Sequence, residues 1–201
     1  ERELSSIAIK AARSVMGGNN VKEQLEALKD QSLALQNERK ELLLKNGFTK
    51  EQIIGSAKTE KTLLKVRNDF RIMTYQDNCE VAKNSDVLVL AVKPQMIDGV
   101  LSEIRKDLKE DVLVVSILAG KTIEYLEKGI GRKVKIARCM PNVAALVGEG
   151  CTGICFNENC EDADKVLTTG ILESIGMAKE VPENLMDAVI GASGSSPAFV
   201  F

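Results

Sequence analysis

The hydrophobic and polar positions of the chain change their pattern near residue 47. From Glu1 to Asn46 the apolar residues recur at helical intervals, and no strand-like run, aromatic residue or proline interrupts them. A glycine-containing break at residues 16–20 predicts two helices. Charged residues surround the leucines of the second helix, which suits either a solvated face or a coiled-coil arm that binds a partner. We therefore expect residues 1–46 to form a helical hairpin or a coiled-coil-like arm.

After residue 47, short β-branched runs alternate with amphipathic segments. The runs predict strands at 52–56, 70–74, 86–92, 112–118 and 133–139, and the segments between them predict helices at 59–68, 78–84, 95–108 and 121–130. A short strand near 153–156, a helix over 160–174, a strand near 177–182 and a helix from about Pro197 follow. This alternation predicts a Rossmann-like α/β fold with a mostly parallel, doubly wound sheet over residues 47–196.

Composition excludes several kinds of site and partner. The chain contains no histidine, which excludes a Ser-His-Asp triad, a Cys-His dyad and a histidine-ligated zinc. The formal net charge of −2 gives no overall footprint for nucleic acid or an anionic membrane, so neither is expected as a partner. No stretch is apolar enough to span a membrane, no secretory signal is evident, and the five cysteines are an odd number; these features predict a reduced, cytoplasmic setting.

Three of the cysteines lie close together in the sequence, at Cys151, Cys155 and Cys160. Their spacing is not C-x-x-C, and no second pair accompanies them. Buried apolar thiols are therefore favoured over zinc ligands, and no metal site is expected.

The residues that follow the first predicted strand suggest which dinucleotide the sheet would bind. Ligands of open parallel sheets lie outside the carboxyl ends of the strands. The strand at 52–56 ends in Ser56, with Lys58 and Thr59 close behind, where hydroxyl and cationic groups suit a ribose 2′-phosphate and so favour NADP over NAD. An alternative is that Ser56 and Thr59 only cap the next helix.

Three further strands end in small residues or prolines, which predicts sharp turns at the same edge. Pro94 and Pro141 suit the first turn of a helix, and small residues would let a flat nicotinamide ring approach the backbone. The predicted turn residues are Ala91, Val92, Lys93 and Pro94 after the third strand, Ala119 and Gly120 after the fourth, and Met140, Pro141 and Asn142 after the fifth.

Four segments together resemble pyrroline-5-carboxylate reductases. They are DVLVLAVKPQ (86–95), VVSILAGKTIEYLE (114–127), ARCMPNVAALVGEG (137–150) and DAVIGASGSSPAFVF (187–201), and the resemblance extends from about Leu43 to Phe201. It implies reduction of the small molecule 1-pyrroline-5-carboxylate to L-proline, with hydride from NADPH or NADH. Hydride transfer to an electrophilic iminium needs little acid–base catalysis, which accords with the lack of histidine and leaves no catalytic residue to assign.

The resemblance also assigns binding residues. Ser56 and Lys58 would lie near the 2′-phosphate, and Asn78 with Ala91–Pro94 beside the ribose and nicotinamide. Ala119 and Gly120 would hold the cofactor, while Met140, Pro141 and Asn142 would line the substrate pocket.

The chain departs from this family at two places. The family's first strand and its glycine-rich loop would be expected about 20 residues before the 52–56 strand, and no G-x-G-x-x-G pattern is found there. The sheet is therefore expected to lack its usual first strand and the cofactor its pyrophosphate loop. The family is homo-oligomeric through a C-terminal helical domain, of which only the start, residues 197–201, is expected here.

Residues 1–48 weakly resemble the N-terminal helical region of bacterial replicative helicase loaders, on the segment LEALKDQSLALQNERKELLLKNGF (25–48). An alternative function is therefore a non-catalytic interaction protein, whose N-terminal helices bind a partner such as a replicative helicase. A third alternative, a β-hydroxyacid-type dehydrogenase, would be expected to show a catalytic lysine on a later helix, and no such helix is expected in this sequence.

Overall fold

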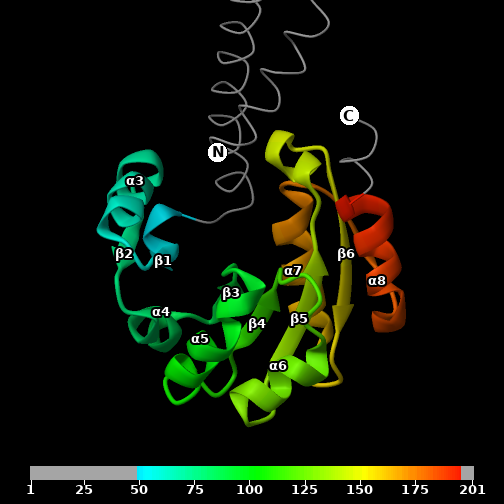
Figure 1. Cartoon of the computed structure of the whole chain (residues 1–201), viewed down its shortest axis with the longest axis horizontal. Coiled ribbons are helices and arrows are strands. Elements are labelled where there is room, and N and C mark those ends of the chain that lie inside the picture. Colours follow the sequence, from blue (N-terminus) through cyan, green and yellow to red (C-terminus); the bar gives the residue numbers. More distant parts are fainter. Residues whose placement is uncertain (1–48, 196–201) are drawn as a thin grey trace, which may run out of the picture. The chain divides into compact units, whose positions relative to one another are not determined.

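The computed structural model describes residues 49–195, which belong to a single compact unit (Figure 1). The predicted arm at 1–46 and the predicted helix from Pro197 lie outside the described residues. Within the described part, the strands form two sheets, one of two strands and one of five. No helix in this part of the chain is long and apolar enough to cross a membrane.

The smaller sheet consists of two short parallel strands, β1 (Ile54–Ser56) and β2 (Met73–Tyr75). Helix α3 (Glu60–Phe70) connects them, and α4 (Asn78–Asn84) leads from β2 to the larger sheet. Because β1 and β2 pair in register and are joined by a helix, they form one βαβ unit.

The larger sheet has its strands in chain order. These are β3 (Val87–Leu90), β4 (Leu113–Ser116), β5 (Lys135–Met140), β6 (Gly150–Phe156) and β7 (Gly176–Glu180). The helices are α5 (Ile97–Ile104), α6 (Ile123–Ile130), α7 (Asp162–Glu173) and α8 (Met186–Val189). Neighbouring strands are parallel except for β5 and β6, which are antiparallel. The sheet is therefore mostly parallel, as the pattern predicted.

Short turns of helix complete the described chain. They are 3₁₀ turns at Lys50–Gln52, Pro94–Met96 (η2), Val143–Val147 (η3) and Glu183–Leu185, and a π-helical turn at Ile190–Ser195.

Polar side chains and left-handed residues set the ends of the helices. Thr122 Oγ1 accepts a hydrogen bond from the Tyr125 amide at the start of α6 (3.1 Å), and Asp77 accepts one from the Cys79 amide at the start of α4 (2.8 Å). Gly131, with φ of 77°, ends α6. Arg71, with φ of 55°, ends α3 in the same way and is the only residue other than glycine with a positive φ in the described chain.

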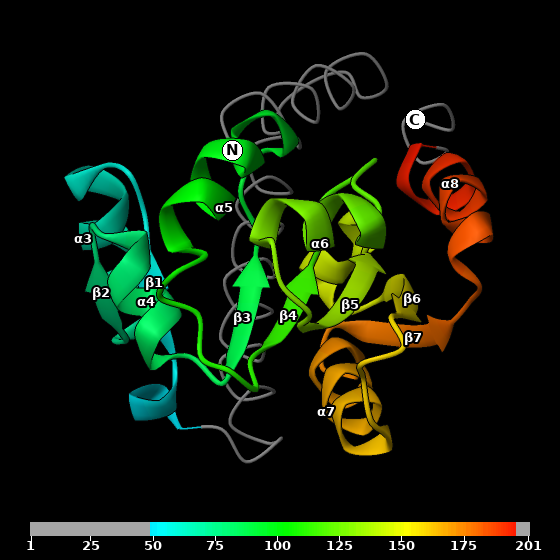
Figure 2. The ribbon, with the colours of Figure 1, turned by 90° about the horizontal axis from the view of Figure 1, so that it is seen from below.

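The core lies on both faces of the larger sheet. Helices α5 and α6 cover one face and α7 covers the other (Figure 2). Every residue of β4 is buried, which is typical of a central strand between two helical layers. The cluster on the α5–α6 side also receives Ile54 and Tyr75 from the smaller sheet, so both sheets share one core.

The structure confirms the predicted Rossmann-like α/β fold. Within residues 49–195 the predicted strands and helices are found near their expected places, although most strands are shorter than their apolar runs, and Phe70, expected to begin the second strand, ends α3 instead. The sheet was predicted to lack its usual first strand. In the structure β1 and β3 are not paired with each other, so the strands form two separate sheets. Helix α8 and the π-helical turn after it were not predicted, because their apolar positions are too few to show a helical period.

Candidate functional site

The carboxyl ends of β3, β4 and β5 meet at one edge of the larger sheet. These three strands are parallel neighbours, so the segments that follow them emerge side by side. The structure therefore brings together the predicted residues of three turns: Ala91–Pro94, Ala119–Gly120 and Pro141–Asn142. Ala91, Ala119 and Gly120 are exposed there, which leaves room for a flat ligand against the backbone.

The turn after β3 is fixed by backbone hydrogen bonds. The Ile117 amide donates to the Leu90 carbonyl oxygen (3.2 Å), which ties the end of β3 to β4. Lys93 is extended, Pro94 begins η2, and the Met96 amide donates to the Lys93 carbonyl oxygen (2.8 Å). Pro94 suits this position because its φ is fixed near the helical value. The chain thus leaves the sheet edge abruptly, as predicted.

The turn after β4 depends on Gly120, whose φ of 70° lies in the left-handed region. The ammonium group of Lys121 lies 3.8 Å from the centre of the Tyr125 ring. The Tyr125 hydroxyl in turn hydrogen-bonds Asp98 on α5. These contacts hold the start of α6 against α5 at the predicted ligand edge.

The turn after β5 is held by Asn142. Its side-chain oxygen accepts a hydrogen bond from the Cys151 amide (3.2 Å) in β6, so its Nδ2 group is the donor that this side chain can offer to a ligand. Met140 borders the π-helical turn, since a Cβ atom at Gly194 would lie 3.1 Å from Met140 Cε. The predicted substrate-pocket residues therefore lie where β5 meets the last part of the described chain.

Ser56 and Asn78 form a second group, at the end of β1. Ser56 Oγ donates to Asn78 Oδ1 (2.7 Å), and Asn78 Nδ2 donates to Glu103 Oε2 (2.9 Å) on α5. Lys58, which follows Ser56 closely in the sequence, has an exposed side chain. The alternative interpretation, that Ser56 and Thr59 cap α3, is confirmed for Thr59 only, whose Oγ1 accepts a hydrogen bond from the Thr62 amide (3.3 Å). Glu103 was not predicted to belong to this group, because it lies 25 residues from Asn78 in the sequence.

Arg138 was also missed. Its side chain is only 4% exposed, and its guanidinium group lies 3.1 Å from Glu183 Oε1 and 3.5 Å from Asp187 Oδ1. The same Glu183 oxygen accepts a hydrogen bond from the Ile123 amide (2.8 Å) at the start of α6. Arg138 thereby ties β5 to α6 and α8, two residues before Met140. The sequence signal that could have indicated it is an arginine between the apolar residues Ala137 and Cys139 of a predicted strand.

Several cysteine thiols have raised pKa values. Burial raises the pKa of the Cys139 thiol to about 12 and that of the Cys155 thiol to about 11. A hydrogen bond with the Asp107 carboxylate is the main cause that raises the pKa of Cys79 to about 11. These thiols stay protonated at neutral pH, and thiolate is the reactive form. The prediction of buried thiols is confirmed for Cys155, whereas Cys151, near the start of β6, is exposed and Cys160 is only partly buried.

One group of potential metal ligands occurs in the described chain: ligand atoms of Asp77, Cys79 and Glu103 lie within 4.8 Å of one another. Glu103 already accepts a hydrogen bond from Asn78, and Asp77 caps α4. Both carboxylates of this group therefore already have hydrogen-bond partners within the chain.

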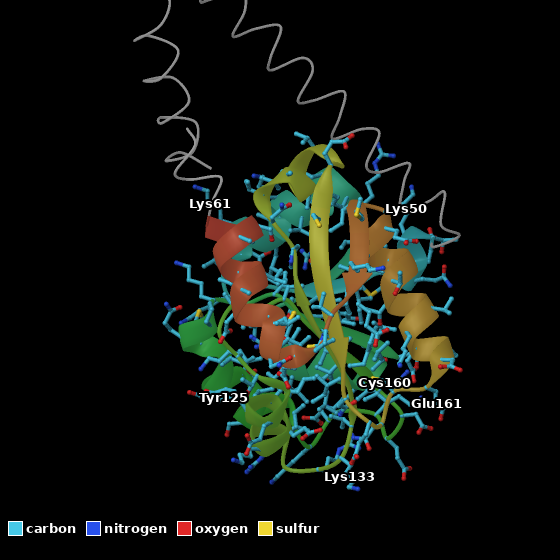
Figure 3. The ribbon with its side chains drawn as sticks, turned by 90° about the vertical axis from the view of Figure 1, so that its right-hand side faces the viewer. Lys50, Lys61, Tyr125, Lys133, Cys160 and Glu161 are labelled. Atoms are coloured by element: carbon cyan, nitrogen blue, oxygen red, sulfur yellow. The ribbon has the colours of Figure 1, made fainter. Side chains whose placement is uncertain are left out.

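Two surface hollows stand out in residues 49–195, and neither contains a predicted site residue. One, of about 430 Å³, includes Glu127, Lys133 and Asn159 in its lining. Figure 3 shows Lys133 at the end of the molecule where Cys160 and Glu161 precede α7. The other, of about 420 Å³, is lined by the ends of β6 and β7 and includes Glu183. The candidate site is therefore an open edge rather than either of these hollows.

Residues 39–120 match a family model described as NADP oxidoreductase, coenzyme F420-dependent. The chain is 37% identical over 159 residues to a pyrroline-5-carboxylate reductase from Methanosarcina acetivorans, covering 79% of this chain and 59% of the relative. It is 45% identical over 139 residues to a pyrroline-5-carboxylate reductase from Synechocystis, covering 67% of this chain and 51% of that protein. The chain thus spans little more than half the length of these curated relatives.

Solved structures show the same similarity in three dimensions. A pyrroline-5-carboxylate reductase from Coxiella burnetii superposes with a TM-score of 0.76 at 32% identity, covering 83% of this chain and 63% of that one. A pyrroline carboxylate reductase from Plasmodium falciparum with NADP bound superposes with a TM-score of 0.69 at 32% identity, covering 79% and 58%.

Proposed function

We propose that this chain forms the cofactor-binding part of a pyrroline-5-carboxylate reductase, an NAD(P)H-dependent oxidoreductase of proline biosynthesis. The observation that supports this most is the 37% identity over 159 residues, which extends through all three turns at the carboxyl edge of the larger sheet. The complete protein would reduce 1-pyrroline-5-carboxylate to L-proline in the cytoplasm, as a homo-oligomer.

The residues of the sheet edge suit a nicotinamide nucleotide. Ala91, Ala119 and Gly120 are small and exposed at adjoining turns, so a flat ring can lie against their backbone. Val92, Lys93 and Pro94 would border the ribose and nicotinamide. A bound reduced nicotinamide supplies the hydride that the imine carbon accepts. The chain's own contribution is then to orient the two reactants and to exclude water.

Met140, Pro141 and Asn142 would line the substrate side of this edge. The Asn142 Nδ2 group is a donor suited to a carboxylate, and its Oδ1 contact with the Cys151 amide fixes the orientation of the side chain. No general acid is required if the imine nitrogen enters the site already protonated. This proposal therefore assigns positioning roles and no proton-transfer residue.

Lys58 would distinguish NADPH from NADH. Its exposed ammonium group provides three donors near the end of β1, where a 2′-phosphate would lie.

The test is calorimetric titration of the chain with NADPH and NADH, paired with an assay of imine reduction. Lys58→Ala should weaken NADPH binding by roughly tenfold and leave NADH binding nearly unchanged, because only NADPH carries the phosphate. Lys61→Ala, an exposed lysine on α3, is the matched control and should change neither affinity. Equal losses for both nucleotides would remove the assignment of Lys58, and the absence of any nucleotide binding would refute the proposed function of this chain.

A further inference from the structure

Arg138 places a buried cation near the carboxyl end of β5. Its side chain is 4% exposed, and in the sheet it lies beside Ser116, the last residue of β4. Removing a guanidinium group from water is costly, and an apolar side chain of similar size often stabilises such a position as well or better. An arginine at this place therefore suggests a role other than stability.

Glu183 connects Arg138 to the turn after β4. Its Oε1 atom accepts hydrogen bonds from the Arg138 guanidinium group (3.1 Å) and from the amide of Ile123 (2.8 Å). Ile123 is the first residue of α6 and follows the Ala119–Gly120 turn closely in the sequence. A single carboxylate oxygen therefore fixes the start of α6 relative to β5.

The other end of the same turn is fixed by the sheet. The Ile117 amide donates to the Leu90 carbonyl oxygen of β3 (3.2 Å), and the Leu118 amide donates to the Ser116 hydroxyl oxygen (3.4 Å). The Ala119–Gly120 turn thus lies between an end that is held by β3 and β4 and an end that is held by Glu183. Loss of the Glu183 contact would release one end only.

The substrate-side turn lies on the other side of Arg138. Met140 follows it by two residues at the end of β5. Met140 in turn borders Gly194 in the π-helical turn, to which α8 leads. Asp187 of α8 lies 3.5 Å from the same guanidinium group. Arg138 is therefore joined to both sides of the candidate site.

We propose that Arg138 and Glu183 are positioning residues, which set the distance between the Ala119–Gly120 turn and the Met140–Asn142 turn. This inference rests on the proposed reductase function, in which the first turn holds the nicotinamide and the second lines the substrate pocket. Because Arg138 is buried and its charge is paired within the chain, the pair acts through the two turns and not on a ligand. Reaction rates depend steeply on such distances, since a misplacement of about 1 Å can cost about a hundredfold.

The test compares two ligands that share only their adenosine end. Isothermal titration calorimetry with the full chain measures the affinities for NADPH and for adenosine 2′,5′-bisphosphate, which carries the 2′-phosphate but no nicotinamide. Glu183→Ala should weaken NADPH binding by about tenfold, because the nicotinamide turn is no longer held against β5. It should leave the affinity for the bisphosphate within about twofold, because that ligand lies at the end of β1. General damage to the fold would instead weaken both.

Two further variants separate the acceptor from the charge. Glu183→Gln keeps an oxygen that can accept from the Ile123 amide, so it should restore NADPH affinity to within about threefold of the unchanged chain. Asp187→Ala is the matched control, since Asp187 faces the same guanidinium group but its side chain is 88% exposed and has no hydrogen bond to α6 within residues 49–195. This variant should leave both affinities within about twofold.

A double variant allows for the chance that Glu183→Ala does not fold with an unpaired buried cation. Arg138→Met combined with Glu183→Leu replaces the pair by apolar side chains and still removes the acceptor of the Ile123 amide. The double variant should show the same selective loss of NADPH affinity. Far-ultraviolet circular dichroism verifies the fold of each variant before titration.

The unchanged chain distinguishes failure of this inference from failure of the proposed function. If it binds neither ligand, the proposed function is refuted and the positioning role with it. If it binds NADPH, but loss of Glu183 weakens both ligands equally or neither, only the positioning role is overturned. A Glu183→Gln variant as weak as Glu183→Ala, or an equal effect of Asp187→Ala, would also overturn that role.

Discussion

The buried guanidinium group of Arg138 has two carboxylate partners, Glu183 and Asp187, and Glu183 makes the closer and more numerous contacts. Both carboxylates face the Arg138 guanidinium group, but Glu183 lies nearer, at 3.1 Å, and also accepts the Ile123 amide. Asp187 lies at 3.5 Å with its side chain 88% exposed, so water already solvates it. Loss of Glu183 would leave a buried cation without its main partner and a helix amide without its acceptor.

We therefore expect Glu183→Ala to lower the free energy of unfolding by about 2–4 kcal/mol, and Asp187→Ala to lower it by about 1 kcal/mol or less. Urea denaturation of the two variants beside the unchanged chain measures both values. Similar losses at the two positions would show that Glu183 has no special role in joining β5 to α6.

The buried thiols predict a dependence of stability on alkaline pH. The pKa of Cys139 rises from the ordinary 9.0 to about 12 in the folded chain, so above pH 9 the folded state holds a proton that the unfolded state releases. The free energy of unfolding should then fall as pH rises from 9 toward 12, by up to about 1.4 kcal/mol per pH unit for this thiol. Cys139→Ala should flatten this slope in urea denaturation across that pH range, whatever its effect at pH 7. An unchanged slope would contradict the assignment.

At the scale of elements, two glycines decide how closely β6 and β7 approach. Gly176 begins β7 with φ of 139°, and a Cβ atom there would overlap the backbone carbonyl and amide of Gly150. Gly150 is equally confined, since its own Cβ would meet the Ile175 carbonyl oxygen at 2.7 Å. The first pair of the β6–β7 ladder thus requires glycine on both strands.

Gly176→Ala should destabilise the chain by about 3 kcal/mol or more, because the strands must separate or the backbone must leave its conformation. Gly170→Ala is the control: Gly170 lies in α7 with open space around its Cβ position, so the change should be neutral or stabilise by up to about 1 kcal/mol. Thermal unfolding compares the two. A tolerated Gly176→Ala would mean that the start of β7 shifts without loss of pairing.

The elements that the sequence predicted correctly are those with a local signal. Apolar β-branched runs identified β3, β4 and β5, and Pro94 with Gly120 marked two turns at the ligand edge. What it missed depends on contacts between distant residues: Glu103 reaches Asn78, and Glu183 reaches Arg138 from 45 positions away. The antiparallel direction of β6 was also not predicted, since a pattern of apolar residues shows that a strand is buried and not which way it runs.

At the scale of the whole molecule, the two sheets differ in the interactions that hold them. Strands β1 and β2 have three residues each and only Thr74 is buried among them, whereas β4 is buried throughout. Local stability follows buried apolar contact and protected hydrogen bonds.

Native-state hydrogen exchange should therefore show the β1–β2 pair opening at a lower free energy than the larger sheet. We expect the amides of β4 to exchange only by global unfolding, with the full urea dependence, and those of β1 and β2 to exchange by smaller openings with little urea dependence. Identical exchange free energies and urea slopes in the two sheets would show instead that they unfold as one unit.

The chain order of strands β3 to β7 has a consequence for synthesis. Each strand of the larger sheet pairs with the strand that follows it in the sequence, so every new strand adds to the edge that was completed just before it. A nascent chain emerges from the ribosome in the same direction. This sheet can consequently grow by one strand at a time during translation, because no strand of it has to wait for a partner that is made later than its next neighbour.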